Sequence, residues 1–307
     1  MAANGQQGAA LREELGSFGV WLGALGLEPA ARERDLACRL EALGYGALWF
    51  GEALANREAL SHAAILLGAT ERIAVASGIA NIWVRDATAA ANGAYALNEA
   101  FDGRFVLGLG VSHRPIVDPR GHDYGRPLAA MRAYLDGLDA HRYGGPAPAR
   151  EPRRVLAALR PRMLELARDR AAGAHPYFVP PEYTERARAL LGAEPFLAPE
   201  QVVVLDSDPS SARSLGRRHM QIYLQLPNYL DNLRQLGFDE EDFVGGGSDR
   251  LVDAIVAWGT VETVVARVRE HLQAGADHVA VQAHADTPAA ALAALEELAP
   301  ALGLKAR

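Results

Sequence analysis

The sequence predicts a (β/α)₈ barrel, in which a closed parallel sheet is surrounded by helices. Short apolar runs alternate with helical segments along most of the chain, which is typical of repeated βαβ units. The chain has 307 residues, of which 50% are hydrophobic, and this length suits one barrel domain. Gly23 and Gly26 do not have the spacing of a Gly-x-Gly-x-x-Gly fingerprint, so an open dinucleotide-binding sheet is disfavoured.

Eight apolar runs are expected to form the strands of the barrel. They are short, as buried parallel strands are, and several are bounded by glycine or proline. The first ends near Gly23, and the second is followed directly by Gly51. The strands are expected at 18–22, 47–50, 73–79, 104–109, 155–159, 174–179, 201–205 and 278–282.

Helices are expected after most of these strands. In the first of them, at 29–43, Leu36, Leu40 and Leu43 share one face, and Pro29 suits a first helical turn. Residues 1–15 are small and polar and are expected to be a flexible N-terminus ahead of one barrel domain at 16–303. Further helices are expected at 57–68, 88–100, 161–172, 181–191, 261–274 and 288–302.

Two connections are longer than usual and are expected to be insertions after strands 4 and 7. The first covers 115–153 and the second 216–257. Long segments that follow barrel strands usually shape a substrate pocket, and Tyr223, Asn228 and Tyr229 of the second are candidates for covering the substrate. A packing or dimer role is an equally open alternative for the second insertion.

The composition of the chain disfavours some classes of binding partner. The net charge of −7 and the pI near 5.7 argue against nucleic acid and anionic membranes. No apolar run approaches the roughly 20 residues that cross a bilayer, and no signal-peptide pattern is present, so a cytoplasmic protein is expected. No His, Cys and carboxylate cluster has metal-ligand spacing, so no metal is expected. We expect a homodimer, with His219 and His271 at the surface.

Candidate site residues follow from one rule of the barrel fold. Active-site side chains come from the C-terminal ends of the strands and from the loops that follow them. The rule selects residues after strands 2 to 6. They are Gly51 and Glu52, then Gly78, Ile79 and Asn81 with Arg85 beyond, then Gly110, Val111, Ser112 and His113, then Arg160 and Arg162, then His175, Pro176 and Tyr177.

Four of these candidates are singled out for a specific chemical reason. Arg160 and Arg162 flank Pro161 at the start of a helix, and free backbone N–H groups beside two guanidinium groups can bind an anion. His113 can transfer a proton near neutral pH, or it can hydrogen-bond a cofactor or a substrate carbonyl. Glu52 is a candidate acid or base. It could also be a carboxylate that stabilises a helix N-terminus.

Several segments resemble the luciferase-like superfamily, and more closely its branch dependent on the deazaflavin coenzyme F420. The resemblance extends over about 16–283, and Asp-Gly-Arg-Phe at 102–105 is its most specific block. The segments that carry it are 77–81, 95–99, 102–110 and 154–167.

The resemblance implies a cofactor site at the strand ends. It implies a cis peptide between Gly78 and Ile79 under the cofactor ring, and it places the cofactor phosphate in the loop after strand 5. Many relatives have glycine where this chain has Arg160. The expected cofactor-binding residues are Gly51, Ser77, Gly78, Ile79, Asn81, Gly110, Val111, Ser112, Ala158, Leu159, Arg160, Arg162, Met163, His175, Pro176 and Tyr177, with His113 and Glu52 as the catalytic pair.

The resemblance also implies a reaction class. Alcohol and sugar-phosphate dehydrogenases of this group often have histidine where this chain has Ala53, so we expect a reductase. It would transfer hydride from reduced F420 to an activated C=C or C=N bond of a small molecule or a modified peptide. Two alternatives stay open: a flavin monooxygenase that uses FMN and oxygen, and a barrel that binds a ligand without turnover.

Overall fold

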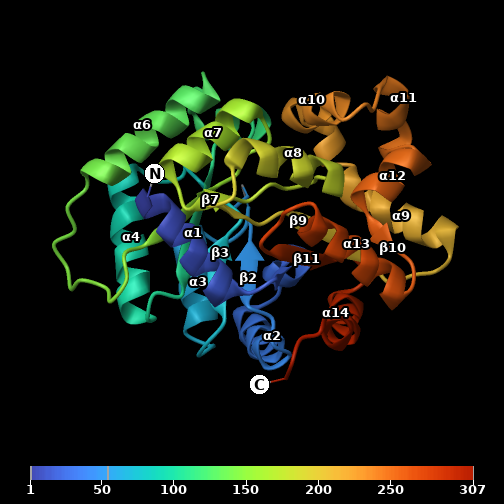
Figure 1. The fold of residues 1–307 in the computed structure, drawn as a ribbon, viewed down its shortest axis with the longest axis horizontal. Helices are drawn as coiled ribbons and strands as arrows, with labels where there is room; N and C mark the ends of the chain where they lie inside the picture. The colour runs from blue at the N-terminus through green and yellow to red at the C-terminus, as the bar shows by residue number, and fades with distance from the viewer. Residues whose placement is uncertain (1, 54, 307) are drawn as a thin grey trace.

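One parallel sheet runs through the centre of the protein, and helices lie around it (Figure 1). The computed structural model describes residues 2–53 and 55–306. Every strand pairing in this described part is parallel, in the order β10-β9-β11-β1-β2-β3-β5-β6-β7-β8, with β4 beside β5. The strands are β1 (Phe18–Trp21), β2 (Ala47–Phe50), β3 (Ala74–Ser77), β4 (Ala80–Asn81), β5 (Phe105–Gly110), β6 (Arg153–Leu156), β7 (Gly173–Ala174), β8 (Phe196–Leu197), β9 (Glu200–Val204), β10 (Ala257–Trp258) and β11 (Val279–Ala283).

The parallel strand pairings and the helices around them confirm the α/β class and the parallel topology. The sheet is also curled. The segment between β8 and β9 bonds to both sides: Ala198 N donates to Ala174 O at 3.0 Å, and Ala280 N donates to Pro199 O at 2.9 Å. β11 also pairs with β1, so the β8 end of the sheet comes back close to the strands at the other end of the order. The expected strand at 73–79 contains only β3, and β4 lies just beyond it. The Gly78–Ile79 peptide between β3 and β4 is cis, as the resemblance implies.

Helices follow most of the strands, and some of them begin with a side-chain cap. Asp86 accepts a hydrogen bond from Ala89 N at 2.7 Å at the start of α4, and Thr287 does the same for α14. The helices are α1 (Ala2–Leu15), α2 (Ala30–Ala42), α3 (Ala59–Leu67), α4 (Ala87–Ala100), α5 (Arg114–Val117), α6 (Pro127–Ala140), α7 (Pro161–Arg170), α8 (Pro181–Leu191), α9 (Pro209–Met220), α10 (Pro227–Gln235), α11 (Glu240–Phe243), α12 (Asp249–Ile255), α13 (Val261–Gln273) and α14 (Pro288–Leu302).

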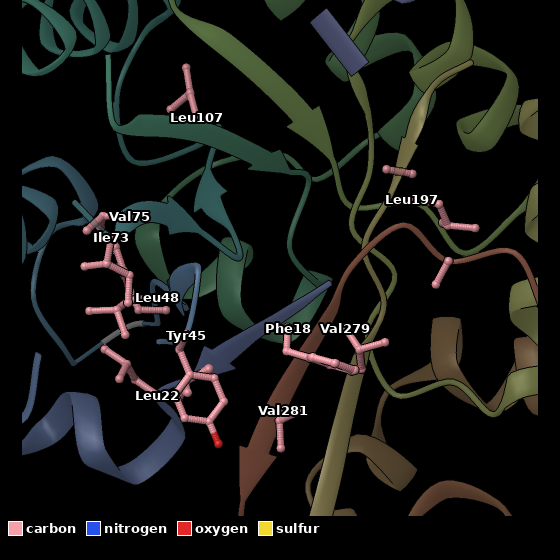
Figure 2. Close-up of a cluster of buried hydrophobic side chains, with 14 of the residues drawn as sticks. Phe18, Leu22, Tyr45, Leu48, Ile73, Val75, Leu107, Leu197, Val279 and Val281 are labelled. Atoms are coloured by element: carbon pink, nitrogen blue, oxygen red, sulfur yellow. The ribbon is translucent and has the colours of Figure 1, made fainter. Parts of the chain in front are cut away.

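The two faces of the sheet bury different clusters. In β2, Leu48 and Phe50 belong to the large cluster between the sheet and the helices, whereas Ala47 and Trp49 belong to a second cluster on the other face. Figure 2 shows part of the large cluster, with side chains from several neighbouring strands. The alternation of successive residues explains why these short strands are buried on both sides.

The N-terminal prediction was wrong. Residues Ala2–Leu15 form α1, whose Leu11 and Leu15 are fully buried in the second cluster with Trp49. Arg12 fixes the helix from its other side, because its Nε donates to Asp277 Oδ1 at 2.7 Å. Two leucines one turn apart anchor an otherwise small and polar segment, which composition alone does not reveal. Met1 lies outside the described residues.

The two long connections contain helices rather than open loops. The first includes α6, which packs beside α4 and α7. The second includes α10, α11 and α12, and with α9 they enclose a cluster of their own around Met220 and Leu233. No helix in the described part of the chain is both long and apolar enough to cross a membrane.

The surface prediction for two histidines was also wrong. His271 is fully buried and lies between Thr184 Oγ1 at 2.8 Å and Gln201 Oε1 at 2.9 Å. His219, which belongs to the second insertion itself, is buried with its ring centroid 5.2 Å from that of Tyr223. Both rings are on helix faces that pack inward, and a single polar residue does not reveal that face in the sequence.

Candidate functional site

A cavity opens at the C-terminal ends of the strands, where the barrel rule places a site. Most of the predicted residues line it. They are Gly51, Glu52, Gly78, Ile79, Gly110, Val111, Ser112, His113, Ala158, Leu159, His175 and Tyr177.

Three predicted residues line neither this cavity nor the adjoining cavity at the start of α7. The Ser77 hydroxyl donates to Gly108 O at 2.8 Å inside the sheet. Asn81 Oδ1 accepts from Trp83 N at 3.0 Å, and Pro176 O accepts from Glu200 N at 3.0 Å. All three stabilise the strand ends on which the cavity is built.

Gly78 has no side chain, so two aromatic rings of the cavity wall can lie close to its backbone. A Cβ on Gly78 would lie 2.7 Å from His175 Nε2 and 2.9 Å from Trp21 Nε1. A side chain at this position would therefore displace both rings. Both of these nitrogens are buried and have no hydrogen-bond partner in the described part of the chain. A buried donor and a buried acceptor without partners are costly, and at a cavity they indicate a ligand position.

His175 has a fixed tautomer. Its Nδ1 donates to Ala198 O at 2.7 Å, so Nε2 is left as a hydrogen-bond acceptor. The ring stacks on Trp49 with 4.3 Å between centroids. Burial lowers the pKa of His175 to about 4, so the imidazole is neutral at pH 7. The neighbouring Trp49 Nε1 donates to His278 Nε2 at 3.1 Å, which holds the stack in place.

Glu52 lines the cavity but its carboxylate is already occupied. Its Oε1 accepts from Ala59 N at 3.0 Å, at the start of α3, and its Oε2 accepts from Asn81 N at 2.8 Å. The same carboxylate forms an ion pair with Arg85, which is also paired with Glu58 at 2.6 Å. This arrangement fits a residue that positions the ends of β2 and β4 and stabilises a helix N-terminus.

His113 is the polar side chain with the most freedom to act. It follows Ser112, whose φ of +55° is unusual for a residue other than glycine. Its ring makes no hydrogen bond with any described residue. Burial lowers the pKa of His113 to about 4, so a neutral imidazole with a free N–H faces the cavity near pH 7.

Several lining residues were not assigned to the site from the sequence. Trp21 ends β1, so the rule of strand ends would have found it if applied to the first strand. From the sequence, Tyr223, Asn228 and Tyr229 are candidates only for covering the substrate, because the sequence does not fix how their insertion folds back. The unassigned lining residues are Trp21, Ile116, Ala157, Tyr223, Asn228 and Tyr229.

A second cavity adjoins the first and contains the predicted anion site. Val111, Ala157, Leu159 and Asn228 line both cavities, so the two are adjacent. The second is also lined by Arg160, Pro161, Arg162 and Met163 at the start of α7. Arg160 is paired with Asp231 of α10 at 3.3 Å, whereas no ion pair of Arg162 is found among the described residues.

Comparison with known proteins identifies relatives along most of the chain. A family model described as luciferase-like monooxygenase matches residues 5–278. The 5,10-methylenetetrahydromethanopterin reductase of Methanolobus tindarius is 30% identical over 156 residues, which are 46% of this chain and 48% of the reductase. The chain therefore spans about half the length of this curated relative.

Two solved structures share the fold. A coenzyme F420-dependent tetrahydromethanopterin reductase from Methanopyrus kandleri has a TM-score of 0.74 at 20% identity, covering 94% of this chain and 99% of the other. The oxygenating constituent of 3,6-diketocamphane monooxygenase from Pseudomonas putida, in complex with FMN, has a TM-score of 0.69 at 17% identity, covering 95% of this chain and 100% of the other.

Proposed function

The chain belongs to the luciferase-like monooxygenase family, and we propose that it is an F420-dependent reductase. The single observation that carries the proposal is the pair of adjacent cavities. One is lined by strand ends and aromatic rings, and the other by Arg160 and Arg162 at a helix start. A cofactor with a flat ring and a phosphate-bearing arm matches both parts. We also propose that the sheet is a closed barrel of eight strands, which the shared fold with an F420-dependent reductase supports.

The residues present fit a deazaflavin ring. The unpartnered Trp21 Nε1–H is a donor and the unpartnered His175 Nε2 is an acceptor, and both lie close to Gly78. The pyrimidine edge of a deazaflavin carries carbonyl oxygens and an N–H, so it could satisfy both. Arg160, Arg162 and the free N–H groups that begin α7 would hold the phosphate.

The chain's own residues have separate roles in the proposed reaction. Bound F420 would supply a hydride, and a proton from solvent or a hydrogen-bonding group would complete the reduction of an activated C=C or C=N bond. His113 would donate a hydrogen bond to the atom that becomes negative during this addition. Glu52, through Asn81 and Arg85, positions the strand ends under the ring. The cytoplasmic location and the homodimer stay predictions.

We expect F420 to bind at least about tenfold more tightly than FMN, which corresponds to about 1.4 kcal/mol. The physical reason is that F420 has a longer acidic arm than FMN, and the two arginines of the predicted anion site can pair with it. The measurement is a titration of the purified chain with each cofactor, followed by fluorescence quenching. Equal affinities, or tighter binding of FMN, would contradict the preference.

Replacing both Arg160 and Arg162 by alanine is expected to weaken cofactor binding by about tenfold or more, because charge-assisted hydrogen bonds contribute about 1.5–3 kcal/mol each. The same titration measures it. Arg168→Ala is the matched control, since Arg168 is in the last turn of the same helix. Unchanged affinity in the double variant, with a circular dichroism spectrum like the parent's, would remove the arginines from the site.

A flavin monooxygenase is the second candidate. It is supported by the shared fold of an FMN-containing monooxygenase. Reduced flavin reacts quickly with oxygen, whereas a deazaflavin reacts sluggishly because carbon replaces the reactive nitrogen. Rapid mixing of the reduced, loaded protein with oxygen therefore separates the two candidates. A chain that binds neither cofactor would instead support the ligand-binding barrel.

A further inference from the structure

Five aromatic rings form a continuous wall along the first cavity. The centroids of Trp21 and Tyr177 are 5.1 Å apart, and those of Tyr177 and Tyr223 are 5.2 Å apart. The wall continues from Tyr223 to Tyr229 at 5.5 Å and from Tyr229 to His113 at 5.1 Å. All five residues line the cavity. Neighbouring rings are inclined to each other by 50°, 55°, 81° and 39° along this series, so the wall is a stepped surface of rigid ring faces and edges.

The cavity carries almost no net charge for a ligand to meet. Among the described residues that line it, Glu52 is the only one charged at neutral pH, and its charge is balanced by Arg85. His113 and His175 are neutral because burial lowers the pKa of each to about 4. The cations that could hold an acidic group, Arg160 and Arg162, lie in the adjoining cavity. A charged group entering the aromatic part would lose its hydration without gaining a partner.

The tyrosine hydroxyls in the wall differ in how they are bonded. Tyr177 O–H donates to Gln282 Oε1 at 2.9 Å, so in its 2.7 Å contact with Tyr223 the proton comes from Tyr223. Both of these protons are therefore used within the protein. Tyr229 O–H has no hydrogen-bond partner among the described residues, and its residue lines the cavity. It is the hydroxyl that can donate to a ligand without breaking an existing bond.

We propose that the part of the wall formed by Tyr223, Tyr229 and His113, beyond the Trp21 end that the cofactor ring would meet, binds a planar, uncharged, conjugated carbonyl compound, whose carbonyl oxygen accepts a hydrogen bond from Tyr229. This inference rests on the proposed function, because it names the substrate class of the same site. Stacking on an individual ring face favours a planar ligand, the balanced charge favours a neutral one, and the free hydroxyl favours a ligand with a hydrogen-bond acceptor. Tyr177 and Gln282 hold the Tyr223 hydroxyl in place within the wall.

The proposal is tested by calorimetric titration of the full chain loaded with oxidised F420. Three probes are compared, and each pair to be compared differs in one property. Benzylideneacetone is planar, neutral and conjugated. Benzylacetone is its saturated, flexible analogue, and cinnamate is planar but charged. Benzylideneacetone is expected to bind at least about fivefold more tightly than benzylacetone, and cinnamate at least about tenfold more weakly than benzylideneacetone. Failure of all three to bind, or tightest binding of cinnamate or benzylacetone, would overturn the proposal.

The hydrogen bond is tested by Tyr229→Phe, which keeps the ring and removes the hydroxyl. Benzylideneacetone is expected to bind about three- to tenfold more weakly to this variant, the usual effect of one hydrogen bond. Tyr143→Phe is the control, since Tyr143 stacks on Tyr95 and does not line the cavity. Unchanged affinity in Tyr229→Phe would contradict the role of the hydroxyl.

The same titrations separate this inference from the proposed function. If F420 does not bind, the probes are titrated into the unloaded chain. The predicted order of the three probes, with weaker binding to Tyr229→Phe, would then support the substrate class even though the cofactor assignment had failed. If F420 binds but the order of the probes differs, the cofactor assignment stands and the substrate class is wrong.

Discussion

Replacing His113 by alanine is expected to lower turnover by about a hundredfold or more, while the affinity for the cofactor changes far less. The neutral imidazole has a free N–H at the cavity, where it can donate to charge that develops on the substrate. Removing one such donor usually lowers the rate by about 10²–10³. The measurement is the rate of oxidation of reduced F420 by benzylideneacetone, followed by cofactor absorbance, beside a cofactor titration.

A conservative variant and a pH profile distinguish this role from a structural one. His113→Asn retains an N–H donor and is expected to recover part of the lost rate. Because burial lowers the pKa of His113 to about 4, no ionisation of this residue should appear in the rate between about pH 5 and 8. An equally large loss of cofactor affinity would make His113 a cofactor ligand. Full activity in His113→Ala would remove it from the site.

Much of the site could be predicted from the sequence because the strand ends of a barrel meet at one face. Gly78, His113 and His175 follow different strands, and they meet at one cavity because the curled sheet brings these ends together. The aromatic wall could be predicted only in part. Tyr223 and Tyr229 belong to an insertion whose position depends on its own cluster around Leu233, and local sequence does not encode that docking.

Strand lengths were predicted less well than strand positions. The expected strand at 174–179 is only β7, Gly173–Ala174, in the structure. His175 N still donates to Leu156 O at 2.9 Å, but Pro176 has no N–H to continue the ladder. The chain then leaves the sheet, and Phe178 adopts a φ of +61°. This departure turns Tyr177 into the cavity instead of leaving it in a strand.

The error at the N-terminus leads to a second large expected effect. Replacing both Leu11 and Leu15 by alanine is expected to destabilise the protein by about 4 kcal/mol or more. Each leucine is fully buried against the inner face of the sheet, and such truncations cost about 2–5 kcal/mol each. Urea unfolding measures the effect as a lower midpoint, since the slope stays similar when only stability changes.

The size of this effect separates a packed helix from a frayed one. Glu13→Ala is the matched control, because Glu13 is exposed on the same helix and should shift stability by no more than about 0.5 kcal/mol. Small domains have only about 5–15 kcal/mol of stability, so Leu15→Ala alone should already lower the midpoint measurably if the double variant does not fold. A flexible N-terminus predicts the opposite, namely that the leucine variants and the control unfold at the same urea concentration. The burial of Leu15 beside Trp49, whose ring supports His175, further implies that the single variant should weaken cofactor binding as well as stability.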